Sequence, residues 1–225
     1  MTLKESLTNT SAIRMTASSI GVVAGLAGME HGFFEMLQGN LTITGNVINA
    51  IGPVQRFWEY GNEPAFTIIP NYFSTGILAM IASLLVIIWA AAFINRKQGP
   101  LILFLLSVMM FLVGGGFCPP ILAILAILVA IGINKPFTSW SKRLPVGLIN
   151  SLAPLWKWFL FVFILLALFA VELAIFGYPL LWFFNADSTL RILSSLGSIT
   201  FFGMGPLVII TTYAYDIQKI QAPRT

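Results

Sequence analysis

Three polar side chains recur at helical spacing in an otherwise apolar stretch of the chain. His31, Glu35 and Gln38 are separated by four and three residues, so an α-helix would carry them on one face. Glu30 would point about 100° away from His31. A histidine and a carboxylate on one face can share a proton, bind a cation or orient a polar substrate. The alternative is that His31 and Glu35 form a structural polar pair near a membrane interface, with no further function.

A further acid, Glu172, stands alone in a second apolar stretch. An ionised group at the centre of a membrane helix costs about 2.5–3.5 kcal/mol on insertion scales, so each of these acids requires a reason. For Glu172, a functional role and a hydrogen bond to another helix are both open. Three more polar residues are candidates for lining a cavity, namely Ser194, Ser198 and Asn71. No catalytic role is assigned to any of them.

The composition shows what kind of molecule must position these groups. Of the 225 residues, 58% are hydrophobic and 9% are charged, and the mean hydropathy is +0.91. A soluble domain carries roughly 25% charged residues, so a soluble enzyme, a nucleic-acid reader and a disordered tail are excluded. The single histidine excludes a multi-histidine metal site, and no nucleotide-binding glycine motif is present. We expect no metal, no cofactor and no nucleic-acid partner.

Stretches of about 20 apolar residues predict membrane-spanning helices. Six stretches meet or approach this length, so we predict an all-α integral membrane protein, a bundle of six transmembrane helices in one domain over 1–225. The first span is interpreted as uncleaved, although a signal peptide could begin in the same way. The predicted spans are about 15–37, 68–94, 100–117, 119–133, 155–176 and 190–213, with an external loop over 38–67.

Two connections carry their own predictions. Three glycines and two prolines lie within 114–120 and break any helix, which predicts a tight hairpin turn between the third and fourth spans. A re-entrant pair is the alternative. In the external loop, the mostly apolar stretch over 47–51 could form a short interfacial helix. In the first span, Gly21, Gly25, Gly28 and Gly32 predict a groove for close approach of another helix.

The distribution of basic residues predicts the orientation. With six spans, both termini face the side that carries ten of the twelve Lys and Arg residues, so we predict that the N- and C-termini are cytoplasmic. The ten are Lys4, Arg14, Arg96, Lys97, Lys135, Lys142, Arg143, Lys157, Lys219 and Arg224. Aromatic residues agree with this orientation. Trp140, Trp156, Trp158, Tyr213 and Tyr215 would mark the cytoplasmic boundary, and Trp58, Tyr60, Tyr178 and Trp182 the outer one.

Two resemblances to known families rest on short blocks. Residues 28–40, with the histidine and both glutamates of the first span, resemble small multi-pass prokaryotic membrane proteins of no assigned function. This likeness extends to 52–58 and to Gly-Gly-Gly-Phe at 114–117. The spacing of His31 and Glu35 is also similar to that in sterol-isomerase (EXPERA) membrane proteins. This resemblance implies that the two residues handle protons next to a buried cationic intermediate. The match covers five residues, and 68–94 lacks the acid that the family carries in its second span.

Three functions remain open from the sequence. The first is transport or binding of a small solute, ion or proton through an outward-facing polar cavity with His31, Glu35 and Glu172. The second is an intramembrane enzyme that modifies a lipid and uses the same groups as acid and base. The third is a non-catalytic subunit or scaffold of a membrane complex. The expected partners are the lipid bilayer, a small solute or lipid, and a packing helix of another chain or of a second copy.

Overall fold

The computed structural model describes residues 11–133, 135 and 144–221. These residues are mostly helical, with one two-stranded sheet. The α-helices are α2 (Ala12–Leu37), α3 (Tyr72–Ile88), α4 (Gly99–Leu112), α5 (Cys118–Ala130), α7 (Val146–Leu152), α8 (Trp156–Phe176), α9 (Ala186–Ser198) and α10 (Gly205–Gln221). The strands are β1 (Val47–Asn49) and β2 (Pro64–Phe66). Single turns of π-helix follow α3 (Trp89–Phe93) and join α9 to α10 (Ile199–Met204), and 3-10 turns cover Ala153–Leu155 and Leu180–Trp182.

Four helical stretches are long and apolar enough to cross a membrane. They are Ala12–Leu37, Tyr72–Phe93, Val146–Phe176 and Ala186–Gln221, which makes the described chain compatible with a membrane location. They correspond to the first, second, fifth and sixth predicted spans. The helices at the third and fourth predicted spans, α4 and α5, have 14 and 13 residues. They are shorter than the roughly 20 residues that a complete crossing requires.

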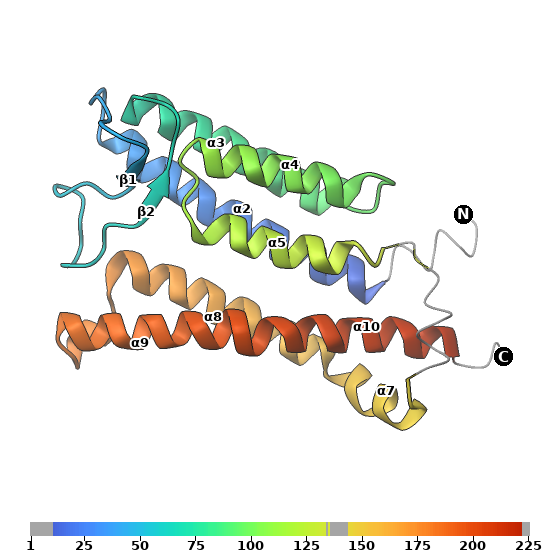
Figure 1. The fold of residues 1–225 in the computed structure, drawn as a ribbon. Coiled ribbons are helices and arrows are strands. Elements are labelled where there is room, and N and C mark those ends of the chain that lie inside the picture. Colours follow the sequence, from blue (N-terminus) through green and yellow to red (C-terminus); the bar gives the residue numbers. More distant parts are fainter. Residues whose placement is uncertain (1–10, 134, 136–143, 222–225) are drawn as a thin grey trace.

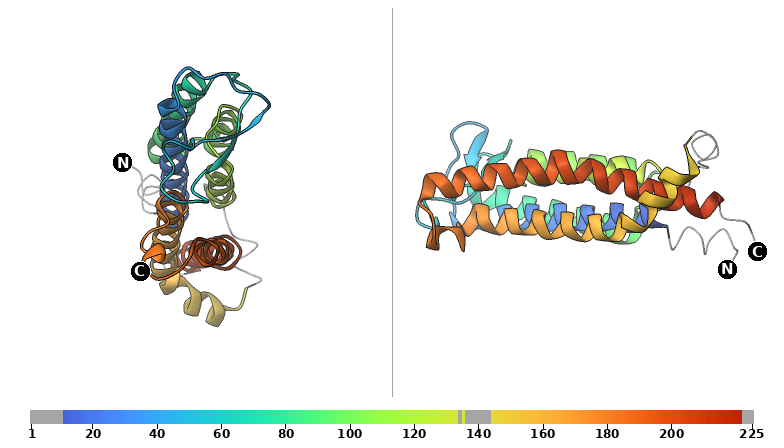
Figure 2. Two further views of the ribbon diagram at one scale, coloured as in Figure 1. Left: turned by 90° about the vertical axis from the view of Figure 1, so that its left-hand side faces the viewer. Right: turned by 90° about the horizontal axis from the view of Figure 1, so that it is seen from below.

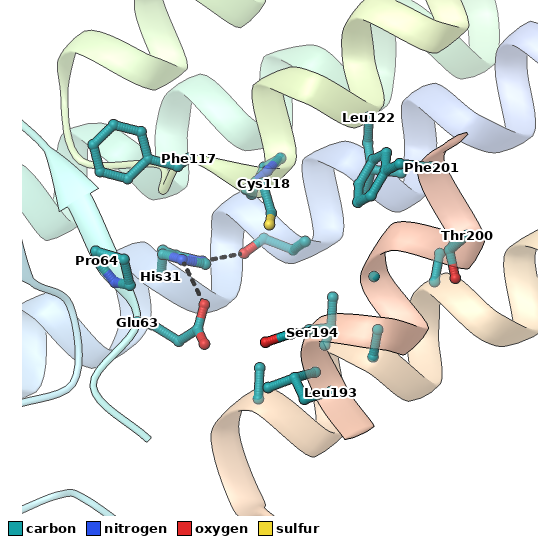
Figure 3. A pocket seen from close by; sticks show the side chains of 17 residues that line it. His31, Glu63, Pro64, Phe117, Cys118, Leu122, Leu193, Ser194, Thr200 and Phe201 are labelled. Atoms are coloured by element: carbon teal, nitrogen blue, oxygen red, sulfur yellow. Dashed lines mark hydrogen bonds and ion pairs between the residues drawn. The ribbon is translucent and has the colours of Figure 1, made fainter. Parts of the chain in front are cut away.

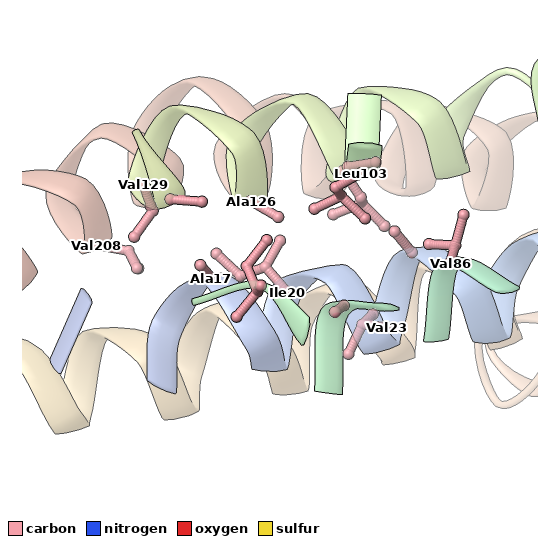
Figure 4. Close-up of a cluster of buried hydrophobic side chains, with 14 of the residues drawn as sticks. Ala17, Ile20, Val23, Val86, Leu103, Ala126, Val129 and Val208 are labelled. Atoms are coloured by element: carbon pink, nitrogen blue, oxygen red, sulfur yellow. The ribbon is translucent and has the colours of Figure 1, made fainter. Parts of the chain in front are cut away.

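Helix α2 lies at the centre of the bundle. It packs most extensively against α3 and α5, while α8 and α10 form a second group of helices beside this first one (Figures 1 and 2). Ala17, Ile20 and Val23 of α2 meet apolar side chains from α3, α4, α5 and α10 in the main core (Figure 4). Alanine is the most frequent buried residue of this core, and small residues of this kind allow close backbone approach between membrane helices.

The predicted glycine groove of α2 is confirmed, and α3 fills it. A Cβ atom on Gly25 would lie 2.8 Å from the Ser83 carbonyl oxygen, and one on Gly32 would lie 2.7 Å from the Gly76 carbonyl oxygen. Both distances are shorter than a carbon–oxygen contact allows, and backbone cannot move aside cheaply. The glycines therefore let the two backbones touch.

The start of α2 and the end of α10 lie together at one end of the bundle (Figure 1). The Asp216 carboxylate accepts hydrogen bonds from the Ser11 hydroxyl and from the backbone N–H groups of Ala12 and Ile13, the latter two at 3.0 and 3.2 Å. A side chain of the last helix thus caps the first one, because free N–H groups at a helix start attract a carboxylate.

The segment over 38–67 lies at the opposite end and contains the sheet. The expected interfacial helix over 47–51 is wrong, because Val47–Asn49 forms β1 and pairs antiparallel with Pro64–Phe66. Gln38 explains the difference: its side-chain amide donates to the carbonyl oxygens of Asn49 (3.0 Å) and Ala50 (2.7 Å). These bonds hold the stretch extended, and Ile48 is buried beneath the segment instead of facing lipid.

The same segment is tied to the second group of helices through two aromatic residues. Trp58 is only 7% exposed, and its indole N–H donates to the Ala174 carbonyl of α8 at 2.9 Å. Its predicted place at the outer membrane boundary stays a prediction, and Trp182, predicted for the same boundary, is 71% exposed. The Tyr60 hydroxyl donates to the Asp187 carboxylate at 2.6 Å, and this hydrogen bond raises the pKa of Tyr60 above its ordinary value of 10. Of the predicted boundary residues, Trp140 lies outside the described residues.

Candidate functional site

His31 is buried in α2 and contacts a polar group on each side of its ring. It is 5% exposed, its Nδ1 lies 3.0 Å from the Ala27 carbonyl oxygen, and its Nε2 lies 3.4 Å from Glu63 Oε2 (Figure 3). A carbonyl oxygen only accepts, so Nδ1 carries a proton. Nε2 has no hydrogen-bond partner among the described residues, so its contact with Glu63 is electrostatic and is attractive when His31 is protonated.

The turn between α4 and α5 forms a roof over His31 and Glu35. Gly114 and Gly116 both have positive φ, +101° and +79°, a conformation that glycine adopts without strain. A Cβ atom on Gly116 would lie 2.4 Å from His31 Nε2, and one on Gly114 would lie 2.3 Å from Glu35 Oε2. The predicted hairpin turn and the predicted polar pair are therefore one site, which we call the glycine roof (Gly114–Gly116).

Contacts from Ile68 and from the start of α3 hold the residues that lead into the glycine roof. The Ile68 N–H donates to the Leu112 carbonyl at 3.0 Å, and the Thr75 hydroxyl donates to the Val113 carbonyl at 2.7 Å. Thr67 bonds Thr75 at 2.6 Å and is buried. These contacts satisfy backbone carbonyls at the end of α4 and fix the chain where it enters the glycine roof.

Glu35 is fully buried beneath the glycine roof. Its exposed fraction is 0%, and neither carboxylate oxygen has a hydrogen-bond partner among the described residues. A buried carboxylate without a partner is strongly disfavoured in its ionised form. Glu35 is thus a neighbour of His31 on the same helix face, as the spacing predicted, but it is not part of the ion pair with Glu63.

A cavity of about 290 Å³ opens beside His31. Figure 3 shows His31, Glu63 and Cys118 on one side of it and Leu193, Ser194 and Thr200 on the other. The wall is mostly apolar, with four small residues contributed by α8: Ala167, Ala170, Val171 and Ala174. The cavity therefore offers hydrocarbon-like walls with the His31–Glu63 pair at one end.

Of the other predicted site residues, one lines this cavity and the rest lie elsewhere. Ser194 lines it, whereas Ser198 does not, although each serine donates to a carbonyl four residues before it at 2.9 Å. Glu30 is half-buried and Glu172 is exposed on α8, and neither lines the cavity. The acid that meets His31 is Glu63 and not Glu172.

Gln38 and Asn71 have structural partners. Gln38 clamps β1 as described above. The Asn71 side chain accepts from the Ser74 N–H at 3.0 Å and donates to Asn40 Oδ1 at 2.7 Å, so it caps α3 and ties it to the end of α2. Because Pro70 and this cap set the helix start, α3 begins at Tyr72 instead of near residue 68 as predicted.

Glu63 and Cys118 are the site residues that the sequence interpretation did not select. Glu63 lies directly before β2 and has a positive φ of +40°, which points its side chain from a surface segment into the bundle. A weak signal existed in the acids of the long loop, but nothing in their spacing singles out Glu63. Cys118 is the first residue of α5, and the glycine roof just before it in the chain sets where α5 begins, so that Cys118 lines the cavity.

Within the described parts of the chain, no group of three or more His, Cys, Asp or Glu side chains could hold a metal ion. The arrangement places an imidazole and a carboxylate, groups that can exchange a proton, next to an apolar space. Comparison with protein-family models, with curated proteins and with solved structures finds no match to this chain.

Proposed function

We propose that this chain is a six-span membrane protein with cytoplasmic termini that binds a largely apolar, lipid-like molecule and exchanges a proton with its polar group. One observation carries the proposal. The walls of the cavity from α5, α8 and α9 are mostly apolar, and an imidazole and a carboxylate, those of His31 and Glu63, lie together at one end. Binding sites for small organic molecules combine apolar walls with a few placed polar groups in this way.

The cavity supports a lipid-like ligand better than a hydrated ion or polar solute. A polar solute needs polar groups along its whole path. Beyond the His31–Glu63 pair the wall offers the Cys118 thiol and the hydroxyls of Ser194 and Thr200, and both hydroxyls already bond carbonyls of their own helix. A hydroxyl, carbonyl or amine group at the end of a hydrocarbon chain would meet the pair while the chain lies along α8. Transport of such a molecule, and acid–base chemistry on it, would both use this site.

The topology in this proposal has support from the ends of the bundle. The start of α2 and the end of α10 are joined through Asp216, as an even number of crossings requires. Helices α4 and α5, each about 20 Å long by helix geometry, lie beside α2 and are capped by the covered glycine roof. The excess of basic residues at the loops of that end supports a cytoplasmic location for both termini.

Cys118 allows a direct test of ligand binding, because it is the only cysteine in the chain and lines the cavity. Purified protein would be labelled with N-ethylmaleimide in the presence of hexadecanol, hexadecylamine or palmitate. We expect at least one of them to slow labelling of the wild-type protein, and the protection to be lost in Glu63→Gln and in His31→Ala.

Two neighbouring serines provide the matched control. Ser194→Leu fills the cavity and should abolish protection, whereas Ser198→Leu, one turn further along the same helix, should leave it intact. If none of the three amphiphiles protects Cys118, or if both serine variants behave alike, ligand binding at this cavity is refuted. Conversion of an extracted lipid by wild-type protein, and not by His31→Ala, would identify an enzyme.

The topology has its own test. Single cysteines near each terminus, in a Cys118→Ser background, would be labelled with a membrane-impermeant maleimide in intact cells and in lysed ones. We expect both termini to react only after lysis. Termini that react on opposite sides of the membrane would exclude an even number of spans.

A further inference from the structure

A second cavity lies at the other end of the bundle, far along the helices from His31. Its volume is about 520 Å³, and it is formed by the end of α5, by α7 and by α10. Ile149 and Ile217 form a fully buried floor, while Ile131, Leu148 and Ile210 on the rim are 43 to 50% exposed. The cavity is therefore an apolar groove that opens sideways from the bundle.

Among the described residues that line the groove, the polar side chains are Lys135 and Tyr213. The Tyr213 hydroxyl donates to the carbonyl oxygens of Leu128 and Val129 at 3.0 and 3.2 Å. A Cβ atom on Gly132 would lie 2.5 Å from the Tyr213 ring, so the glycine lets this ring close against α5. On the far side, Gln218 Nε2 donates to Asn150 Oδ1 at 2.9 Å, which holds α7 against α10. The described walls of the groove therefore suit a hydrocarbon occupant.

The mouth of the groove carries a positive charge. Lys135 lines it and is exposed, and its backbone N–H donates to the Gly132 carbonyl at 3.2 Å. No acidic residue of the described chain lines the groove, and Asp216, the nearest acid in α10, is turned toward the start of α2. A lysine beside an apolar groove suits an anionic headgroup whose acyl chain enters the groove.

We propose that the groove between α5, α7 and α10 binds an anionic phospholipid, with one acyl chain in the groove and its phosphate at Lys135. The site is separate from the His31 cavity and goes beyond the function proposed above. In a bilayer, hydrocarbon chains are the material that fills a lateral apolar groove, and Lys135 supplies the preference for a negative headgroup. One basic residue near an anionic lipid is worth about five-fold in affinity.

The test uses full-length protein in detergent with equal amounts of phosphatidylglycerol and phosphatidylcholine of identical acyl chains. Native mass spectrometry would measure the ratio of the two lipids bound. We expect wild-type protein to favour phosphatidylglycerol, Lys135→Gln to lower that preference about five-fold, and Leu148→Trp at the rim to reduce binding of both lipids. Since Lys135 and Leu148 are exposed, neither variant should impair folding.

Two controls separate this site from other effects. Lys97→Gln removes an exposed basic residue that does not line the groove and should keep the wild-type preference. His31→Ala should also keep it, so that failure of the cavity function and failure of the lipid site can be told apart. An equal lipid ratio in wild type and Lys135→Gln, unchanged binding in Leu148→Trp, or a copurifying polypeptide in the groove instead of lipid would overturn the proposal.

Discussion

Replacement of Gly116 by alanine tests whether the glycine roof is fitted to His31. Gly116 has a φ of +79°, and an added Cβ would lie 2.4 Å from His31 Nε2. The ring cannot swing away cheaply, because it is 5% exposed and its Nδ1 is bonded to the Ala27 carbonyl. The methyl group must therefore displace the roof or the histidine.

The expected loss of stability has two parts. An L-residue with a left-handed backbone costs roughly 1–2 kcal/mol, and insertion of a methyl group into a packed site costs about 1–3 kcal/mol more. Gly39 isolates the first part, because its φ is +74° and a Cβ there would meet nothing within 4 Å. Gly116→Ala should therefore be less stable than Gly39→Ala by about 1–3 kcal/mol.

The assay is unfolding by SDS in mixed micelles, followed by circular dichroism, with each substitution also made in a His31→Ala background. Removal of the ring makes room for the methyl group, so the excess cost of Gly116→Ala over Gly39→Ala should vanish there. Equal stabilities of the two single variants, or an excess that persists without His31, would show that the roof does not rest on the histidine.

Three further substitutions, two of them with a matched control, probe contacts that hold the fold together. Gly32→Ala should destabilise the protein by about 1–3 kcal/mol, because the backbone of α3 occupies the space that the methyl group needs. The control is Gly197→Ala, where a Cβ meets nothing within 4 Å, and it should stabilise the protein by about 0.5–1 kcal/mol. Equal effects of the two substitutions would contradict close packing of α2 on α3. Trp58→Phe removes one hydrogen bond worth about 1 kcal/mol and should speed proteolysis within 38–67 about five-fold, whereas Trp182→Phe should not. Asp216→Asn should weaken the cap of α2 by about 1 kcal/mol, seen as faster hydrogen exchange in its first turn; unchanged exchange would refute the cap.

The sequence alone determined the helical, membrane-compatible character of the chain and the places of its main helices. Hydropathy identifies long apolar stretches without reference to any partner, because the bilayer acts on each stretch separately. Glycine spacing in the first helix likewise predicted close packing, and Gly25 and Gly32 confirm it. The number of spans and the orientation of the termini stay predictions.

Local sequence was less informative where long-range contacts compete with it. The stretch over 47–51 has the composition of an interfacial helix, but Gln38 and β2 hold it extended. The burial of Trp58 likewise depends on a distant partner, the Ala174 carbonyl of α8. In both cases the partner lies more than ten residues away, so no window of sequence contains the reason.

At the site, too, local sequence predicted one part of the arrangement and long-range contacts decided the rest. Helical spacing alone put His31 and Glu35 on one face, because the geometry of an α-helix is fixed. Only the tertiary structure decided that Glu63 is the acid that meets His31 and that the Gly114–Gly116 turn covers both polar residues. It also decided that α8 supplies apolar walls and leaves Glu172 outside the cavity. These outcomes depend on which segments meet in space, and side-chain periodicity within one helix carries no information about that.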